Sequence, residues 1–257
     1  MIKKIIVIGS GKGGVGKSTV SANLAVSLAK KKLKIGLLDA DIYGPSIPRM
    51  LGITEKPKAS KEKKILPYEK YGIKSMSIGN MIPDNSAIIW RGAMASNAIR
   101  QLVNDVEWGD LDYLLIDLPP GTGDIQLSLC QNFSILGAVI VSTPQEISLL
   151  DVRKAISMFK KVNVNIVGMI QNMSYFENAG EKNYIFGKDG VKKESEKQSY
   201  KFLGEVPILE GISSSCDNGE PISHKDEAVF LSVFDKISQN FLESISKIKN
   251  KTVKIES

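Results

Sequence analysis

Histidine and cysteine are nearly absent from this chain of 257 residues. The one histidine, His224, lies in a polar segment, which argues against histidine-based zinc or general-base chemistry. The two cysteines, Cys130 and Cys216, stand far apart and cannot form a disulfide framework, which predicts a reducing compartment.

Long apolar runs and basic runs are also missing. No stretch is apolar enough to cross a membrane, and the first apolar run is too short for a signal peptide, so the sequence predicts a cytoplasmic protein. The net charge is +6, but the lysines are scattered among glutamates, as in residues 56–70. No basic run is interleaved with aromatic residues, which favours a lysine-rich surface over a nucleic-acid or membrane partner.

Apolar strand-like runs alternate with helical patterns along the chain. The strand-like runs are residues 4–8, 34–39, 73–78, 113–117, 138–142, 166–170 and 202–206. The helical patterns are residues 18–30, 93–105, 124–132, 147–161 and 227–249. This alternation predicts an α/β fold, a mostly parallel sheet with helices on both faces, in one domain spanning residues 1–257.

Two segments are open to further interpretation. Residues 56–71 are polar and charged, which predicts a surface excursion. The apolar face of the 227–249 helix predicts docking against the sheet, with a membrane-surface helix as the alternative.

A glycine-rich motif follows the first strand-like run and fits the pattern G-x-x-x-x-G-K-[ST]. Its residues are Gly11, Lys12, Gly13, Gly14, Val15, Gly16, Lys17, Ser18 and Thr19. Glycines let backbone N–H groups turn toward phosphate oxygens, and the following helix directs its positive end at them. Lys17 would reach the β- and γ-phosphates, and the Ser18 hydroxyl would ligate Mg²⁺. The motif therefore predicts a nucleoside triphosphate site.

Two acidic motifs end strand-like runs, where ligands bind in such sheets. The first contains Asp39 and Asp41; a carboxylate here would orient the attacking water or hold Mg²⁺ through water, although turn aspartates are also common. The second begins at Asp117, which is expected to support the Mg²⁺ ion that Ser18 would ligate. Its Pro/Gly-rich continuation would let the Gly121 N–H sense the γ-phosphate as a switch.

Several longer stretches resemble one family. They are GKGGVGKST (11–19), LLDADIYGPSIPRMLG (37–52), WRG (90–92), LDYLLIDLPPGTGDIQL (111–127), VIVSTPQ (139–145), MFKKVNVNIVGMIQNMSYF (158–176) and IFG (185–187). Together they resemble the Mrp/ApbC group of deviant-Walker ATPases, relatives of MinD and ParA. The resemblance implies a homodimeric P-loop ATPase that uses ATP while carrying iron–sulfur clusters. Its partners would be iron–sulfur scaffold proteins and client apoproteins.

The resemblance also implies roles for single residues. Lys12 matches the extra lysine that reaches the partner subunit's nucleotide, and Asp41 matches the aspartate that assists water attack. Lys17 and Ser18 match the phosphate lysine and the Mg²⁺ hydroxyl. Asp117 and Gly121 match the second switch. Asn172 resembles the asparagine that contacts adenine in related ATPases.

The chain departs from the family at one motif. Many members carry a Cys-x-x-Cys pair after NMSYF, and two such pairs would bridge a [4Fe–4S] cluster between subunits. Residues 175–184 of this chain contain no cysteine. Cys130, in an apolar helical pattern, is predicted to be a buried structural thiol. Cys216 is predicted to lie in a loop that could be exposed, where a role as cluster ligand would lack its usual partner.

Two other functions compete with cluster delivery. A positioning ATPase of the MinD or ParA kind, acting on membrane or DNA, would share the core motifs but not the group-specific DADIYGPS stretch. ATP-dependent sedimentation with liposomes or DNA would favour it. An ordinary P-loop kinase would leave Lys12 unexplained, and no phosphate-acceptor site is marked.

Overall fold

One eight-stranded sheet organises the computed structural model, which describes residues 1–81, 92–178, 180–224 and 228–248. The strands follow the spatial order β10 (Phe202–Glu205), β7 (Asn165–Gln171), β6 (Ile135–Ser142), β1 (Ile5–Gly9), β5 (Tyr113–Asp117), β2 (Ile35–Asp39), β4 (Ile73–Ser77) and β3 (Tyr68–Lys70). Every neighbouring pair is parallel except β3–β4. The predicted α/β class with a mostly parallel sheet is confirmed.

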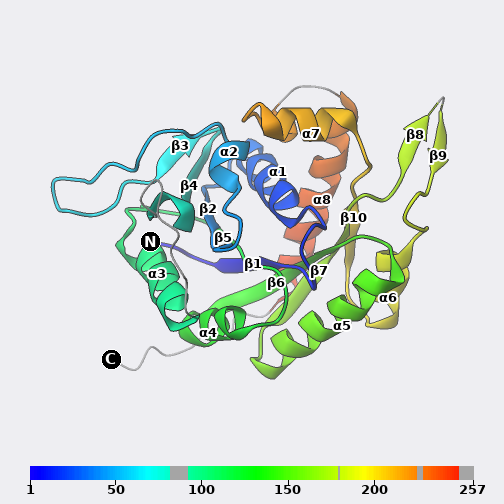
Figure 1. The fold of residues 1–257 in the computed structure, drawn as a ribbon, viewed down its shortest axis with the longest axis horizontal. Coiled ribbons are helices and arrows are strands. Elements are labelled where there is room, and N and C mark those ends of the chain that lie inside the picture. The colour runs from blue at the N-terminus through cyan, green and yellow to red at the C-terminus, as the bar shows by residue number, and fades with distance from the viewer. Residues whose placement is uncertain (82–91, 179, 225–227, 249–257) are drawn as a thin grey trace.

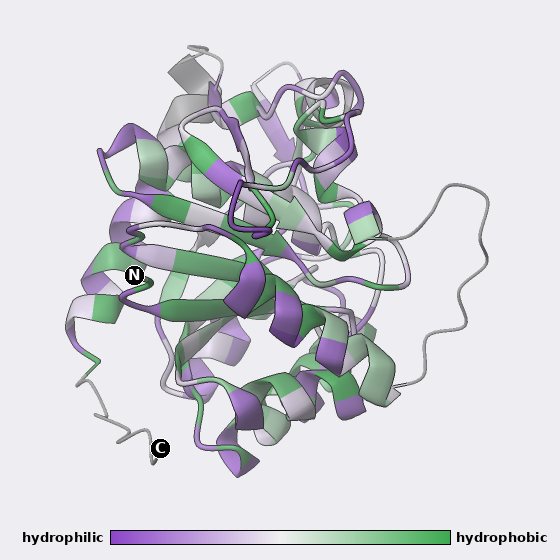
Figure 2. Cartoon of the chain, turned by 90° about the vertical axis from the view of Figure 1, so that its left-hand side faces the viewer, coloured by the Kyte–Doolittle hydropathy of each residue, from purple (hydrophilic) through white to green (hydrophobic). Residues whose placement is uncertain are grey.

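The strands are continuously apolar because both faces of the sheet are covered. In β1, Val7 packs into the core on one face, whereas Ile6 and Ile8 pack into the core on the other. This two-sided burial follows from the alternation of side chains along a strand. Figure 2 shows the apolar strands at the centre of the molecule.

Helices cover both faces, as Figure 1 shows. One face carries α1 (Lys17–Lys30), α2 (Ile47–Met50), α8 (Ala228–Ser246) and the short 3₁₀ turn η2 (Ile222–His224). The other carries α3 (Gly92–Asp105), α4 (Asp124–Asn132), α5 (Glu146–Lys161) and α6 (Gly190–Lys197). Phe234, Ile237 and Phe241 of α8 are buried, so the last helix docks on the sheet as predicted. None of the described helices has the length and apolar character needed to span a bilayer.

Several short elements were not predicted. β3 lies within the predicted surface excursion, and α6 and α7 (Glu210–Asp217) carry few apolar residues that would mark them as helices. β8 (Phe176–Asn178) and β9 (Glu181–Asn183) form a hairpin that projects from the body, visible at the upper right of Figure 1. Trp90 and Arg91 of the WRG motif, and both end residues of the predicted 227–249 helix, lie outside the described residues.

Parallel pairing brings the carboxyl ends of β1, β2, β5 and β7 to one edge of the sheet. Asp39 at the end of β2 stands opposite Asp117 at the end of β5. The glycine-rich motif, which follows β1, therefore lies beside both acidic motifs.

Candidate functional site

The loop between β1 and α1 encloses a cavity of about 190 Å³. The cavity is lined by Ser10, Lys12, Gly13, Gly14, Val15, Gly16, Lys17, Ser18, Thr19, Asp41, Ser46, Met50 and Pro120. Gly14 and Gly16 have φ angles of 76° and 75°, a backbone region that favours glycine. The motif thus forms a backbone-lined cavity at the start of a helix, a shape suited to phosphate oxygens.

Two neighbours hold this loop from outside the cavity. A side chain at Gly11 would clash with Asp151 of α5. A side chain at Gly16 would clash with the amide nitrogen of Asn172, the residue that follows β7. Both glycines are therefore needed for close packing, and sequence reasoning did not identify Asp151.

A buried cluster joins the loop to the end of β5. The Lys17 ammonium lies 2.8 Å from Asp117 Oδ2 and 3.6 Å from Asp41 Oδ2. The Ser18 and Ser21 hydroxyls each donate to an Asp117 oxygen at 2.6 Å. Asp117 is fully buried and Lys17 is 5% exposed. Charges this deeply buried need partners, and the cluster supplies them.

Asp41 lines the cavity beside Lys17. Its carboxylate accepts a hydrogen bond from the Tyr43 N–H at 3.2 Å. Burial raises the pKa of Asp41, and the positive charge of Lys17 opposes that rise. The structure therefore brings Asp41, Lys17 and Asp117 together in one site.

Asp39 is a buried carboxyl that sequence reasoning placed in the first acidic motif without a role of its own. It accepts hydrogen bonds from the Asp41 N–H, the Ile47 N–H and the Ser77 hydroxyl, each at 3.1 Å. Burial, then the charge of Asp117, raises its pKa to about 7. Asp39 thereby ties the start of the Asp41 loop to α2. The only signal in the sequence was its position at the end of an apolar strand-like run.

Gly121 contacts the glycine-rich loop, and Lys12 belongs to it. The Gly121 N–H donates to the Ser10 carbonyl at 3.0 Å, so the second acidic motif rests on the glycine-rich loop. Gly121 has a φ of 92°. Lys12 is half-buried, and its ammonium makes no hydrogen bond or ion pair with any described residue.

Asn172 contacts the loop backbone. Its side-chain amide donates to the Val15 carbonyl at 2.8 Å, and the residue is 7% exposed. It does not line the 190 Å³ cavity. The contact with this backbone was not anticipated from the sequence.

The prediction of an exposed loop at Cys216 was wrong. Cys216 lies in α7 and is 7% exposed, because this short helix packs against α2 and buries the thiol near Thr19 and Asn23 of α1. Burial raises its pKa. Cys130, in α4, is buried as predicted, and burial raises its pKa to about 12. Neither thiol is poised as a metal ligand, since the ligand form is the thiolate and burial disfavours that form.

The segment that lacks the cysteine pair forms the β8–β9 hairpin. The Lys182 ammonium lies 3.9 Å from the centre of the Tyr175 ring, and Phe176 and Ile185 are exposed. Among the described residues, no three His, Cys, Asp or Glu side chains gather as a metal cage. Magnesium bound with phosphates needs no such cage, because it keeps several waters.

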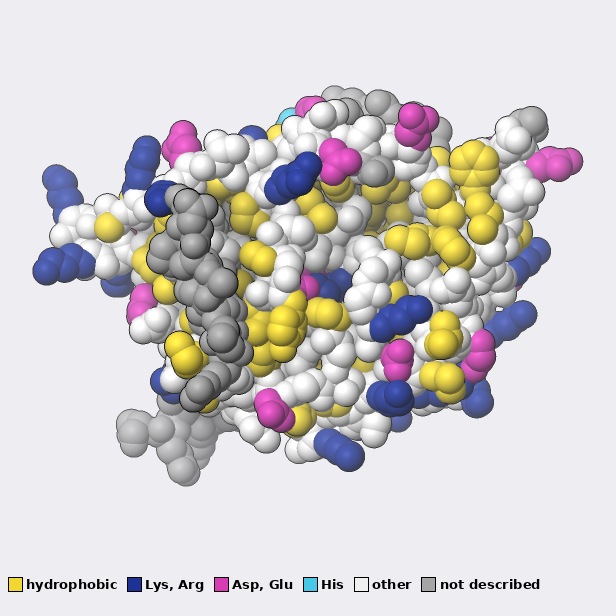
Figure 3. Space-filling view, in the orientation of Figure 1, with side chains coloured by type: hydrophobic (Ala, Val, Ile, Leu, Met, Phe, Trp, Pro, Cys, Tyr) yellow, Lys and Arg dark blue, Asp and Glu magenta, His cyan; other side chains and the backbone are white. Residues whose placement is uncertain are grey.

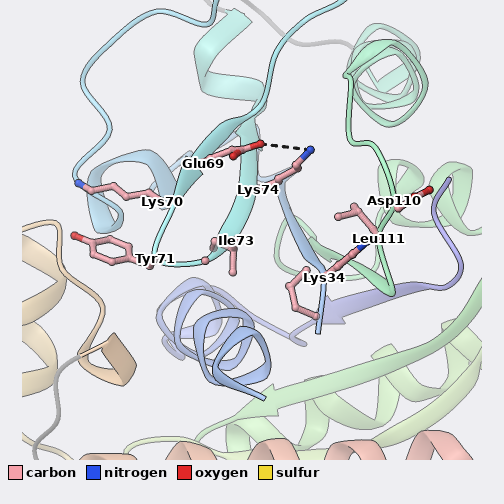
Figure 4. Close-up of a pocket in the computed structure, with 10 residues that line it drawn as sticks. Lys34, Glu69, Lys70, Tyr71, Ile73, Lys74, Asp110 and Leu111 are labelled. Carbon is pink, nitrogen blue, oxygen red and sulfur yellow. Dashed lines mark ion pairs between the residues drawn. The ribbon is translucent and has the colours of Figure 1, made fainter. Parts of the chain in front are cut away.

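A larger cavity of about 560 Å³ lies at the opposite edge of the sheet (Figure 4). Lys34, Lys70 and Lys74 line it together with Glu69 and Asp110, and Lys74 pairs with Glu69 at 3.4 Å. Because it adjoins the amino ends of β2 and β4, it is separate from the glycine-rich loop.

Comparison with known proteins adds a family match. Residues 1–242 match the ParA family model described as NUBPL iron-transfer P-loop NTPase. The chain is 49% identical over 247 residues to the iron-sulfur cluster carrier protein of Aquifex aeolicus, covering 93% of this chain and 68% of that protein. It is 44% identical over 252 residues to the Arabidopsis thaliana iron-sulfur protein required for NADH dehydrogenase, mitochondrial, covering 96% of this chain and 80% of that protein.

Solved structures agree with the fold. A nucleotide-binding protein from Archaeoglobus fulgidus in complex with ADP is 41% identical and has a TM-score of 0.79, covering 91% of this chain and 92% of that one. The septum site-determining protein MinD from Pyrococcus horikoshii, complexed with Mg-ADP, has a TM-score of 0.71 at 23% identity, covering 98% of this chain and 100% of that one. The second likeness shows the fold alone.

Proposed function

This chain belongs to the family of NUBPL iron-transfer P-loop NTPases, and we propose that it binds and hydrolyses ATP while carrying or helping to deliver iron–sulfur clusters to apoproteins. The glycine-rich cavity carries the ATPase part of the proposal, because Lys17 and Ser18 line it and both are bonded to the buried Asp117. The cluster part rests on relatives of 44–49% identity that are named as iron–sulfur proteins.

The loop residues Gly11 to Thr19 would hold the triphosphate. Lys17 contacts two carboxylates, so it can exchange one of them for phosphate oxygens without leaving the cavity. Ser18 and Asp117 offer a hydroxyl and a carboxylate oxygen 2.6 Å apart, which are ligand types that Mg²⁺ prefers. Ser18 would hold Mg²⁺ and Asp117 would support it, and the ion would neutralise charge on the phosphates.

Asp41 and Gly121 would act near the terminal phosphate. Asp41 lines the cavity, and its raised pKa suits a group that orients water or accepts its proton. The Gly121 N–H is bonded to the Ser10 carbonyl, so it could turn toward a γ-phosphate only by leaving that partner. Such an exchange would couple the second acidic motif to the nucleotide.

A homodimer would complete this site. Lys12 reaches no carboxylate among the residues that the structure describes, as expected of a cation that serves a partner's phosphates. Exposed apolar side chains also gather in segments that follow the carboxyl ends of the strands. They are Tyr43, Met81, Met94, Ile147, Leu150, Phe176 and Ile185. Figure 3 shows apolar side chains spread over the side that carries the loop in Figure 1. Apolar surface of this kind marks a contact face.

The dimer can be tested by placing a charge on this face. We expect Ile147→Glu to abolish the mass increase that MgATP causes in sedimentation velocity. Ser246→Glu, at the far end of α8, adds the same charge and should leave dimerisation intact. A monomer with MgATP in the unaltered protein would contradict the proposal.

The cluster would be cargo. Both thiols of this chain are buried, so ligands would come from a partner or from rearrangement around Cys216. We expect that MgATP and this protein together accelerate transfer of a [4Fe–4S] cluster from a scaffold to an apo-dehydratase. ATP hydrolysis without any acceleration of transfer would overturn the delivery role.

Anaerobic reconstitution with iron and sulfide distinguishes a protein that carries a cluster from one that helps to deliver a partner's cluster. A stoichiometric cluster that is lost in Cys216→Ser would identify a carrier with an altered ligand set. Absence of a cluster with transfer intact would identify a delivery ATPase that works on a partner's cluster. The two free thiols fit our proposal of a cytoplasmic, reducing location.

A further inference from the structure

Asn172 contacts the glycine-rich loop from outside its cavity. Its amide nitrogen donates to the Val15 carbonyl at 2.8 Å, while Val15, Gly16 and Lys17 line the cavity and Asn172 does not. Only the amide nitrogen can donate to a carbonyl oxygen, so this hydrogen bond sets the orientation of the side chain. Asn172 therefore acts on the loop backbone from outside the cavity.

The hydrogen bond determines which way one loop N–H points. The peptide between Val15 and Gly16 is trans, so its C=O and its N–H point in opposite directions. Because Asn172 holds the Val15 carbonyl on the outer side, the Gly16 N–H is directed to the cavity side. That is the orientation an N–H needs to donate to a phosphate oxygen.

This peptide is one that could otherwise turn over. Gly16 has a φ of 75°, and glycine accepts both signs of φ with little cost. A side chain at Gly16 would clash with the Asn172 amide, so the loop and Asn172 are in direct contact. Without the amide, the Val15 carbonyl could rotate into the cavity and repel phosphate.

Asn172 is itself firmly held. Its backbone N–H donates to the Ser142 carbonyl of β6 at 2.8 Å. The preceding Gln171 is fully buried, donates to the Ser174 hydroxyl at 2.6 Å and accepts from the Val191 N–H at 3.0 Å. The backbone of Asn172 is therefore fixed, and a side chain on a fixed backbone can hold the loop in one position.

We propose that Asn172 is a positioning residue for the triphosphate, which holds the Val15–Gly16 peptide so that the Gly16 N–H faces the phosphates. Loss of the Asn172 amide should then weaken the binding of every nucleotide, and of a polyphosphate without a base, by the same factor. This differs from the adenine contact that the family resemblance implies. The inference rests on nucleotide binding at the glycine-rich loop.

A ligand without a base separates the two roles. The dissociation constants of MgATP, MgGTP and magnesium tripolyphosphate are measured by calorimetry for the unaltered protein and for Asn172→Ala. We expect all three to weaken by a similar factor of about ten, the size of one lost hydrogen bond. Asn165→Ala, which removes an exposed asparagine at the start of β7, the strand that Asn172 follows, should leave all three unchanged.

A loss confined to MgATP, with tripolyphosphate binding unchanged, would overturn the inference and make Asn172 a reader of adenine. Failure of the unaltered protein to bind any of the three ligands would instead overturn the proposed function.

If Asn172→Ala does not fold, a measurement on the unaltered protein still tests the inference. Hydrogen exchange of the Asn172 side-chain amide, followed by NMR, should be slow without nucleotide and with tripolyphosphate. Exchange that only ATP slows would contradict the inference.

Discussion

The Lys17 ammonium lies 2.8 Å from Asp117 Oδ2, and both side chains are withdrawn from solvent. The two residues are 100 positions apart and meet because β1 and β5 are neighbours in the sheet. The pair links the lysine of the glycine-rich loop to the acidic motif whose Asp117 also accepts a hydrogen bond from Ser18. Nucleotide binding therefore has to rearrange an existing buried charge pair rather than fill an inert cavity.

Replacing Lys17 tests the glycine-rich loop directly. Lys17→Ala should weaken MgATP binding by about a hundredfold or more, because the charge of the β- and γ-phosphates loses its cation and a hydrogen bond between charged groups contributes about 1.5–3 kcal/mol. Calorimetry would measure the loss, with thermal unfolding to show that the variant folds. Lys34→Ala, at the cavity on the opposite edge of the sheet, removes the same charge and should bind normally. Micromolar binding by Lys17→Ala would contradict the assignment.

Lys12 is expected to affect turnover rather than binding. Lys12→Ala should bind MgATP like the unaltered protein but hydrolyse it about 10³-fold more slowly, the contribution that a cation supplied in trans can make. Phosphate release under saturating MgATP would measure the rate. Mixing Lys12→Ala with an excess of a hydrolysis-defective Asp41→Ala chain should restore part of the activity, if Lys12 acts across a dimer. Unchanged turnover in the single variant would remove the argument for a shared site.

Asp39 should make stability depend on pH. Its pKa rises from 3.8 to about 7 on folding, so the folded chain keeps a proton that the unfolded chain loses. The resulting stability is complete below about pH 4 and is lost as pH rises toward 7 and beyond. Asp39→Asn should make this decline shallower, with the part due to Asp41 remaining, and urea unfolding at pH 5 and pH 8, with EDTA present, would measure the change. Asp105→Asn, at an exposed position, should retain the full decline; equal slopes in all three proteins would refute the expectation.

The two cysteines should resist alkylation in the folded protein. The pKa of Cys130 is raised to about 12 and that of Cys216 is raised, both by burial. Iodoacetamide at pH 8 should react with Cys130 about a thousandfold more slowly in native protein than in denaturant, because the thiolate is the nucleophile. Ser246→Cys would supply an exposed thiol as the control. Rapid native labelling of Cys216 would show that α7 opens and makes that thiol available to iron.

Much of the site was readable from local patterns. The glycine-rich motif, Asp41 and Asp117 each lie in short stretches whose residue types and spacing indicate nucleotide and Mg²⁺ binding. Asp151 and the contact of Asn172 with Val15 were not readable, because they depend on how α5 and β7 pack against the loop. The prediction for Cys216 was wrong because a Ser-rich stretch is typical of a loop. Packing against α2 and α1 makes this stretch a helix with a buried thiol.

The order of apolar and polar residues determined the strands, the main helices and the phosphate-binding motif by itself, since these depend on neighbours a few positions apart. The tertiary structure decided which distant groups meet. It alone placed Asp39 opposite Asp117 and buried both thiols. It alone set the Asn172 amide against the Val15 carbonyl. Such pairings arise from the register of parallel strands and the packing of helices on them, which no local pattern encodes.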